Sequence, residues 1–306
     1  MNYKKLFRFL GFVFLVLLFI WIEFGDFTPK DLKTSVKSVQ DTQKEKKIKT
    51  DTDGNLIVTF IDVGQADCIL LRQTDAVMVI DAGNNEDGEL IVNYLKEQDV
   101  NKIDYIIGTH AHEDHIGGLD DLIYNFEVSN IWMPKVATTT KTFEDVLDAV
   151  KAKGLKISTP NIGDEFSLGK AKVTVLHVDN EASDLNDTSI VLKVYYGETS
   201  YLFMGDASKK VEKKLLDSDI ESDVLKVGHH GSQYSSSLDF LEKVAPKYAI
   251  ISVGEKNIYD HPKDTTLEKL ESISAEIYQT SELGTIKTVS DGNIISFSYE
   301  KTNTNG

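Results

Sequence analysis

Along most of the chain, the hydrophobic positions follow two alternating periods. Short runs rich in Val and Ile, bounded by Gly, Gln or Asp, predict β-strands. Apolar residues three or four positions apart predict helices; in residues 89–98, for example, Leu90, Ile91, Tyr94 and Leu95 share one helical face. In the first half of the folded region the pattern predicts strands at 56–62, 68–73, 77–81, 105–108, 131–133 and 155–158, and helices at 89–98, 119–126 and 143–153.

The second half of this region repeats the alternation. Its pattern predicts strands at 165–168, 172–178, 189–196, 200–204, 224–227, 249–253, 285–290 and 294–299, and helices at 208–216, 237–244 and 265–274. Strand meanders in two halves, each interleaved with helices, indicate two sheets packed face to face with helices outside. The sequence therefore predicts an α+β fold of four layers, αββα.

The N-terminal region has the pattern of a membrane segment. Residues 9–22 carry no charge, and Lys4, Lys5 and Arg8 precede them. A spanning helix usually needs about 20 apolar residues, and apolar neighbours on both sides bring this segment near that length. We predict an uncleaved signal anchor over residues 1–27, with a cleaved signal peptide or a buried helix as alternatives.

Residues 28–53 are polar and show no sustained period, which predicts a flexible linker before a folded domain at 54–306. Because basic residues before an anchor favour an inside N-terminus, we expect a single-pass protein of the cell membrane with its domain outside the cell. If the segment is cleaved, the domain is expected to be secreted.

Composition and charge narrow the class of protein. Of the 33 basic and 49 acidic residues, residues 1–53 contain ten and seven, which leaves 23 and 42 and a formal charge of −19 for the rest. A nucleic-acid binder usually presents a basic patch, so nucleic acid is a disfavoured partner. The single cysteine, Cys68, excludes an internal disulfide.

The strongest chemical signal is a cluster of histidines directly after an apolar strand. Three histidines and an aspartate lie within six positions: His110, His112, Asp114 and His115. Histidine is the commonest metal ligand, and alternating residues of an extended loop point the same way. The first two histidines can therefore serve one ion, and the following Asp–His pair a second. A His-rich surface loop is the alternative, but three of seven histidines would then gather here by accident.

This spacing resembles the HxHxDH signature of the metallo-β-lactamase superfamily. The resemblance implies an αββα sandwich with two divalent ions, zinc or manganese. It also implies that Asp81, at the end of the strand predicted over 77–81, supports the histidine loop without binding metal. Asp206, after strand 200–204, is expected to bridge both ions, with a helix N-cap as its alternative role.

A narrower resemblance covers residues 56 to about 275. The stretches 60–67, 224–232 and 251–262 are similar to the metallo-β-lactamase domain of ComEC-type competence proteins. The chain lacks the many hydrophobic segments of those channels, so it resembles a stand-alone, membrane-anchored relative. By this resemblance, His261 completes the second metal site with Asp114, His115 and Asp206.

The sequence departs from the superfamily pattern at one ligand, which many members place between the histidine loop and the bridging aspartate. The one histidine there, His177, lies in a strand pattern and is more simply a partly buried strand residue. Asn186 is the preferred candidate and Asp187 the alternative, since ComEC-like sequences carry an Asn-rich motif here. An oxygen ligand at this position favours manganese over zinc.

The remaining candidates concern the substrate. His229 is expected to bind the substrate anion or to protonate the leaving group, with Asp114 as its catalytic partner, and His230 is assigned to structural support. Ser232 can donate to a phosphate at a helix N-terminus, although helix capping explains a serine there equally well.

The predicted activity is hydrolysis of a small or polymeric phosphodiester, as a phosphodiesterase or nuclease, by a hydroxide held between two ions. A lactone, thioester or β-lactam hydrolase is the second hypothesis. A non-catalytic, metal-binding extracellular module is the third. The sequence sets neither the natural substrate nor the oligomeric state.

Overall fold

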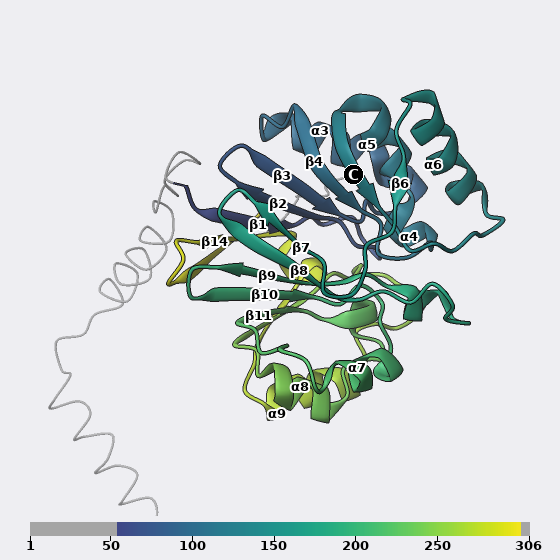
Figure 1. The fold of residues 1–306 in the computed structure, drawn as a ribbon. Helices are drawn as coiled ribbons and strands as arrows, with labels where there is room; N and C mark the ends of the chain where they lie inside the picture. Colours follow the sequence, from purple (N-terminus) through teal and green to yellow (C-terminus); the bar gives the residue numbers. More distant parts are fainter. Residues whose placement is uncertain (1–53, 301–306) are drawn as a thin grey trace, which may run out of the picture. The chain divides into compact units, whose positions relative to one another are not determined.

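Two β-sheets form the centre of the part of the chain that the computed structural model describes, residues 54–300 (Figure 1). The anchor predicted over 1–27 and the linker predicted over 28–53 lie outside the described residues. Within the described part, no helix is long and apolar enough to cross a membrane.

The first sheet contains both ends of the domain. Its strands are, in spatial order, β15 (Ile295–Glu300), β14 (Thr285–Ser290), β1 (Leu56–Phe60), β2 (Ile69–Gln73), β3 (Ala76–Ile80), β4 (Lys102–Ile107), β5 (Glu127–Trp132) and β6 (Ile157–Ser158). The meander β1–β2–β3 is antiparallel, and β3 to β6 are parallel. The C-terminal hairpin pairs with β1, which closes this sheet with the last segment of the domain.

The second sheet mixes the same two kinds of pairing. Its strands are, in order, β13 (Glu276–Gln279), β12 (Tyr248–Ile251), β11 (Val224–Lys226), β10 (Thr199–Phe203), β9 (Val191–Tyr196), β8 (Ala171–His177) and β7 (Glu165–Leu168). Strands β10 to β13 are parallel, and β7 to β10 are antiparallel. The sequence pattern did not predict β13, because this edge strand is short and only partly buried.

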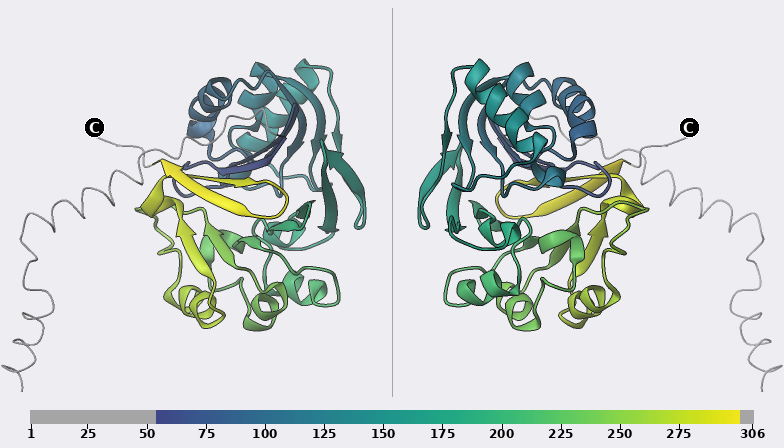
Figure 2. Two further views of the ribbon diagram at one scale, coloured as in Figure 1. Left: turned by 90° about the vertical axis from the view of Figure 1, so that its left-hand side faces the viewer. Right: turned by 90° about the vertical axis from the view of Figure 1, so that its right-hand side faces the viewer.

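Helices cover the outer face of each sheet (Figures 1 and 2). Those on the first sheet are α3 (Gly88–Glu97), α5 (Leu119–Asn125) and α6 (Lys141–Ala152); those on the second are α7 (Lys209–Leu215), α8 (Leu238–Val244) and α9 (Asp264–Ser272). Three apolar cores result, one between the sheets and one under each helix layer. The predicted two-sheet α+β sandwich is therefore confirmed.

Short helical segments lie between these elements. They are η2 (Asn85–Asp87), α4 (Glu113–Ile116), η3 (Leu185–Thr188), η4 (Gly228–Gly231) and α10 (Thr280–Leu283). Three of them, α4, η3 and η4, follow or precede strands at one edge of the sandwich. The carboxyl ends of β3 and β4 in one sheet and of β10 and β11 in the other meet at that edge, where open α/β sheets place their ligand sites.

Candidate metal centre

The histidine loop connects β4 to α4. Its extended part carries His110 and His112, and the first turn of α4 carries Asp114 and His115, so the two pairs of side chains can point in different directions. His112 is the N-cap of α4, and its carbonyl accepts hydrogen bonds from the amides of His115 and Ile116. Before the helix begins, His110 Nε2 and His112 Nδ1 come within 3.0 Å of each other. Two ring nitrogens this close fit a shared cation, because both can then offer a lone pair.

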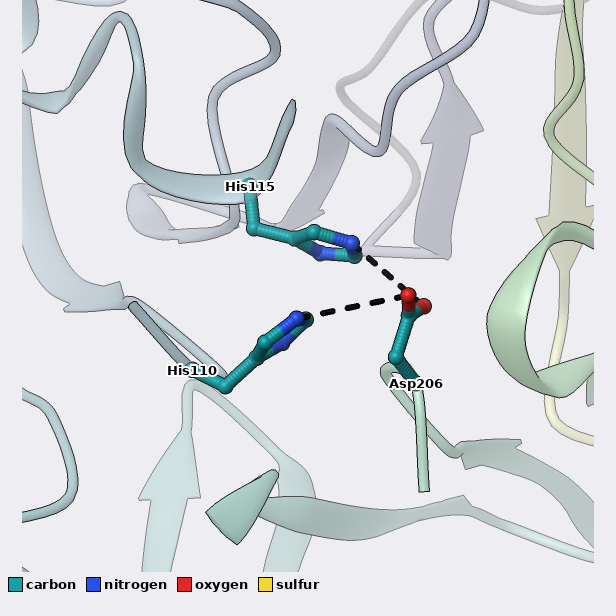
Figure 3. Close-up of side chains that lie close together, drawn as sticks. All are labelled: His110, His115 and Asp206. Atoms are coloured by element: carbon teal, nitrogen blue, oxygen red, sulfur yellow. Dashed lines mark ion pairs between the residues drawn. The ribbon is translucent and has the colours of Figure 1, made fainter. Parts of the chain in front are cut away.

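Asp206 lies just after β10 of the second sheet, and its side chain faces the histidine loop, which follows β4 of the first sheet. Its backbone N–H donates to Ser189 Oγ at 3.1 Å, which fixes the turn. Its Oδ2 atom lies 4.0 Å from His110 Nε2, and its Oδ1 atom lies 3.3 Å from His115 Nε2 (Figure 3). The two oxygens of one carboxylate therefore face two different histidines.

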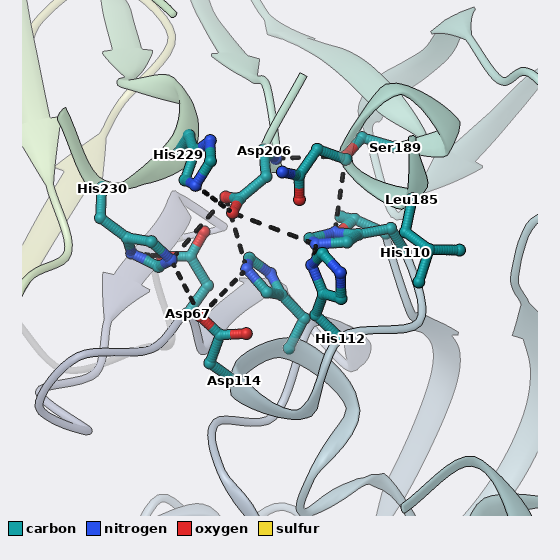
Figure 4. A network of polar contacts seen from close by, with 12 residues as sticks. Asp67, His110, His112, Asp114, Leu185, Ser189, Asp206, His229 and His230 are labelled. Carbon is teal, nitrogen blue, oxygen red and sulfur yellow. Dashed lines mark hydrogen bonds and ion pairs between the residues drawn. The ribbon is translucent and has the colours of Figure 1, made fainter. Parts of the chain in front are cut away.

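His230 completes a second group of side chains. Its Nε2 atom lies 3.5 Å from Asp114 Oδ2 and 3.7 Å from Asp206 Oδ1 (Figure 4). Its Nδ1 donates to the Ser252 carbonyl at 2.9 Å. This donation places a proton on Nδ1, so in the neutral ring the Nε2 lone pair faces the carboxylates. Sequence reasoning gave His230 a supporting role; the structure places it within the cluster.

The backbone explains how neighbouring histidines reach different places. Both His229 and His230 have φ of +52°, in the left-handed region that non-glycine residues rarely occupy. Such strain gathers at functional sites, where the surrounding structure imposes it. While His230 is buried, His229 is 23% exposed, with its Nε2 atom 3.6 Å from Asp206 Oδ2.

Behind the cluster, Asp81 holds His115. Its Oδ2 atom accepts from His115 Nδ1 at 2.8 Å and from Thr109 Oγ1 at 2.8 Å, and its Oδ1 atom accepts from the Thr109 amide at 2.7 Å. A carboxylate on the far nitrogen of an imidazole fixes the tautomer of a metal-binding histidine. Asp81 therefore lies where a supporting residue is needed.

Several buried atoms in this cluster have no hydrogen-bond partner among residues 54–300. They are His115 Nε2, His230 Nε2, Asp206 Oδ1 and Asn186 Oδ1, and His261 Nδ1 in the adjoining cavity is also unpartnered. Buried polar atoms are rarely left in this state unless a ligand satisfies them. Imidazole and carboxylate atoms from this cluster lie within 4.8 Å of one another in two groups, His110–His115–Asp206 and Asp114–His115–His230. This donor set fits divalent cations.

The three candidates for the ligand between the histidine loop and Asp206 differ in their surroundings. Asn186, in η3, lines the same cavity as Asp206 and has an unpaired oxygen. By contrast, Asp187 accepts from the Ser208 amide at 3.3 Å, at the start of α7. His177 Nδ1 donates to the Ser189 carbonyl at 3.0 Å, and although its Nε2 is also unpartnered, the ring does not line the cavity.

Two other predicted residues are not brought into the cluster. His261 lines the cavity, but it belongs to none of the metal-ligand clusters found in the described part of the chain. Its ring centroid lies 5.7 Å from that of His229. Ser232 is buried, its Oγ accepts from the Tyr234 amide at 3.3 Å, and it does not line the cavity.

The cluster opens into a cavity of about 320 Å³ that continues into a larger groove of about 770 Å³. Four residues line both: Gln65, Glu113, Asp114 and Tyr259. The groove carries six acidic side chains and one lysine: Asp62, Glu86, Asp87, Glu113, Asp114, Glu255 and Lys256. A bound molecule that extends from the cavity along this groove therefore meets negative charge.

Electrostatics keep the central carboxylate ionised. Burial alone would raise the pKa of Asp206, but His115 and His230 lower it well below 3.8. Burial alone would lower the pKa of His115, but Asp206 and Asp81 raise it well above 6.5. Burial, with His115 nearby, lowers the pKa of His110 well below 6.5. At neutral pH Asp206 is therefore ionised and His110 is neutral, the forms in which a carboxylate and an imidazole bind a cation.

Sequence reasoning missed residues that support the cluster from behind. Ser189 holds the turn at Asp206, and Asp67 forms a buried ion pair with Lys226 at 2.8 Å. The sequence does contain an indication of a buried ion pair, because a lysine inside an apolar run such as 224–227 is unusual unless it is paired. That lysine is Lys226.

Comparisons with known proteins agree with this geometry. A family model described as the Metallo-beta-lactamase superfamily matches residues 61–255. ComE operon protein 3 of Bacillus subtilis (strain 168) is 30% identical over 251 residues, which cover 75% of this chain and 32% of that protein. Competence protein ComA of Neisseria gonorrhoeae is 26% identical over 234 residues, with 75% and 32% covered. The predicted resemblance to ComEC-type competence proteins is confirmed.

The chain spans about a third of the length of these curated relatives. Among solved structures, the metallo-beta-lactamase fold protein YhfI from Bacillus subtilis superposes with a TM-score of 0.53 at 11% identity. That match covers 80% of this chain and 100% of that chain. At this identity, the likeness concerns the fold alone.

Proposed function

The chain belongs to the metallo-beta-lactamase superfamily, and on this basis we propose that it hydrolyses phosphodiesters with two divalent metal ions. Its fold is that of a metal-dependent hydrolase. The observation that carries the two-ion proposal is the position of Asp206, whose two oxygens face His110 and His115 separately. A single carboxylate placed in this way can contact two ions.

The proposed ligands divide into two sets around Asp206. His110 Nε2, His112 Nδ1 and the orphaned Asn186 Oδ1 form the first set. Asp114, His115 and His230 form the second set. Relative to the sequence prediction, His230 takes the place of His261. Supporting this exchange, His230 Nε2 lies 3.5 Å from Asp114 Oδ2 and 3.7 Å from Asp206 Oδ1. His261 Nδ1 is also buried without a hydrogen-bond partner among residues 54–300, but it belongs to neither group of candidate ligands around Asp206.

When bound, a pair of divalent ions generates a nucleophile from water at neutral pH and neutralises charge on the attacked centre. The chain's own residues would do the rest. His229 and His261 line the cavity outside the ligand sets. Burial, with His229 and His230 nearby, lowers the pKa of His261 to about 4, so its imidazole is neutral at pH 7 and can hydrogen-bond a phosphoryl oxygen.

His229 is the proposed proton donor to the leaving group. It is partly exposed, and its Nε2 atom lies 3.6 Å from Asp206 Oδ2 at the edge of the ligand cluster. Asp206 can therefore orient the ring while leaving His229 within reach of a substrate. Zinc and manganese both suit the mixed nitrogen and oxygen ligands, and the Asn186 oxygen favours manganese in the first set.

Two imidazoles beside the metal ligands favour a phosphodiester over a lactone, thioester or β-lactam, because His261 can donate to a non-bridging phosphoryl oxygen while His229 protonates the leaving-group oxygen. The acidic groove argues against a long polyanion such as nucleic acid. We therefore place small diesters, or polymers with few charges near the scissile bond, ahead of DNA and RNA.

The test is a substrate panel on the full chain, purified in mild detergent and loaded with Mn²⁺ or Zn²⁺. It contains bis(p-nitrophenyl) phosphate, a single-stranded oligonucleotide, an acyl lactone and nitrocefin. We expect turnover of the first compound, loss of that turnover in Asp206→Asn, and wild-type turnover in Asp217→Asn, an exposed control. Turnover of only the lactone or nitrocefin contradicts the proposal. Two bound ions without turnover of any compound favour the binding module.

We also propose that the domain lies outside the cell, on the basis of the apolar pattern of residues 1–27 and the basic residues that precede it. Protease added to intact cells that produce the chain is expected to remove the domain and leave an N-terminal fragment in the membrane. A domain found intact in the medium favours secretion, and a domain cut only after lysis contradicts an external location.

A further inference from the structure

A buried ion pair joins the two sheets directly behind the metal centre. Lys226, the last residue of β11, donates from Nζ to Asp67 Oδ2 at 2.8 Å, and Asp67 lies between β1 and β2. The two side chains are only 1% and 2% exposed. Apolar residues often replace such pairs without loss of stability, because the desolvation of two charges is costly. Holding the sheets together is therefore a weak explanation for this pair.

The pair also contacts the second set of proposed ligands. Asp67 Oδ1, the oxygen that faces away from Lys226, lies 3.6 Å from His230 Nδ1 and has no hydrogen-bond partner among residues 54–300 (Figure 4). The Asp67 amide donates to the Asp114 carbonyl at 3.0 Å. One residue thus touches the side chain of one proposed ligand and the backbone of another.

The position of this carboxylate bears on the tautomer of His230. The Nδ1–H of His230 donates to the Ser252 carbonyl, and negative charge beside that edge favours the proton on Nδ1. Nε2 then keeps its lone pair toward Asp114 and Asp206, and the carboxylate increases the basicity of that nitrogen. Lys226 holds Asp67 through its other oxygen and offsets its charge in the interior.

The arrangement parallels the one around His115, where Asp81 accepts from Nδ1 directly. One carboxylate oxygen each of Asp67 and Asp81 and one ring nitrogen of His115 lie within 4.8 Å of one another. Because two carboxylates this close together in the interior repel each other, a buried cation is needed beside them. Lys226 is that cation.

We propose that Asp67 and Lys226 form a positioning pair that fixes the orientation and tautomer of His230 and thereby sets the affinity for one of the two metal ions. This inference rests on the proposed metal centre. The pair does not touch the substrate, so its effect is expected in metal binding first and in turnover only as a consequence.

The test compares three full-length chains in mild detergent: wild type, Lys226→Met, and the double variant Asp67→Asn/Lys226→Met. For each chain, Zn²⁺ affinity is measured by competition with a chromophoric chelator, and thermal unfolding is recorded without metal. Lys226→Met alone leaves a buried carboxylate unpaired, so its metal-free Tm is expected to fall. The double variant removes both charges and is expected to recover most of that Tm.

The decisive readout is the metal affinity of the double variant. We expect one ion to bind roughly 10- to 100-fold more weakly than in wild type while the other is unchanged, even though stability has recovered. Wild-type affinity for both ions in a stable double variant overturns the inference, because a merely structural pair predicts that result. If the double variant does not fold, Asp67→Asn is titrated in its place, and unchanged affinity there also overturns the inference. Wild type that binds no ion instead refutes the proposed function.

Discussion

The Nε2 atom of His230 lies 3.5 Å from the Oδ2 atom of Asp114, although the segments that carry the two residues follow strands of different sheets. Asp114 is in α4, after the first sheet's β4, and His230 is in η4, after the second sheet's β11. The contact shows that the cluster is assembled from both halves of the sandwich. It also distinguishes His230 from His229 and His261, which line the cavity but belong to none of the metal-ligand groups among the described residues.

The first prediction uses that distinction. His230→Asn is expected to weaken one of two bound ions by roughly tenfold or more, because it removes a nitrogen that faces two carboxylates. The matched variant His261→Asn is expected to keep both ions and to lower kcat for bis(p-nitrophenyl) phosphate by roughly 10²-fold, since it removes a group that contacts the substrate. Elemental analysis after dialysis and steady-state kinetics check both. The opposite pattern would restore His261 as the ligand.

The second prediction concerns Asn186, whose buried oxygen is unpaired in the described part of the chain. Asn186→His is expected to shift the preference of one site from Mn²⁺ toward Zn²⁺ by roughly tenfold or more, because imidazole is a softer ligand than an amide oxygen. Competition between the two ions, followed by elemental analysis, gives the ratio. Asp187→His is the control and is expected to leave the ratio unchanged, since Asp187 accepts from the Ser208 amide instead.

The third prediction concerns pH. Burial alone would lower the pKa of His115 and of His230, but nearby carboxylates, led by Asp206, raise both pKa values above 6.5. A raised folded pKa stabilises the metal-free chain fully below the unfolded value of about 6.5, and this stability is lost as pH rises through the folded pKa. We therefore expect the metal-free Tm to fall as pH rises above 6.5.

Metal binding should show the complementary effect. Because metal ligation needs neutral imidazole, Zn²⁺ binding at pH 7 is expected to release protons from His115 and His230, and the affinity should weaken as pH falls. Calorimetry in two buffers of different ionisation enthalpy measures the protons released. A heat of binding that is the same in both buffers would contradict the raised pKa values.

The fourth prediction tests the acidic groove. Glu86 and Glu255 are exposed and line it. The double variant Glu86→Lys/Glu255→Lys is expected to raise kcat/KM for a single-stranded oligonucleotide roughly tenfold at low salt, and the gain should shrink as salt is added. Turnover of bis(p-nitrophenyl) phosphate should barely change. Glu198→Lys/Glu242→Lys, outside the groove, is the control; an equal gain there would assign the effect to net charge.

The histidine loop and the sandwich could be predicted from sequence because both depend on local patterns. His110, His112, Asp114 and His115 lie within six positions after an apolar strand, so their convergence needs only one turn of chain. The four layers of the sandwich could be predicted for a similar reason, because the alternation of strand-like and helix-like spacing is also a local pattern. The edge strand β13 was missed because its four residues are too few and too exposed to show a period.

The assignment of His230 depended on information that no local pattern carries. Two consecutive left-handed residues turn His229 and His230 in different directions, and nothing in the residue types requires that backbone. The burial of Ser232 at the end of η4, outside the lining of the cavity, is likewise set by tertiary packing that no local pattern reveals. Lys226, by contrast, was visible as a charge in an apolar run, but its partner lies 159 positions away.

Anomalous diffraction from crystals of the chain soaked in zinc would locate the bound ions. We expect two peaks, one beside His110, His112 and Asn186 and the other beside Asp114, His115 and His230, with Asp206 contacting both. A single peak, or two peaks of which only one contacts Asp206, would contradict the two-ion proposal.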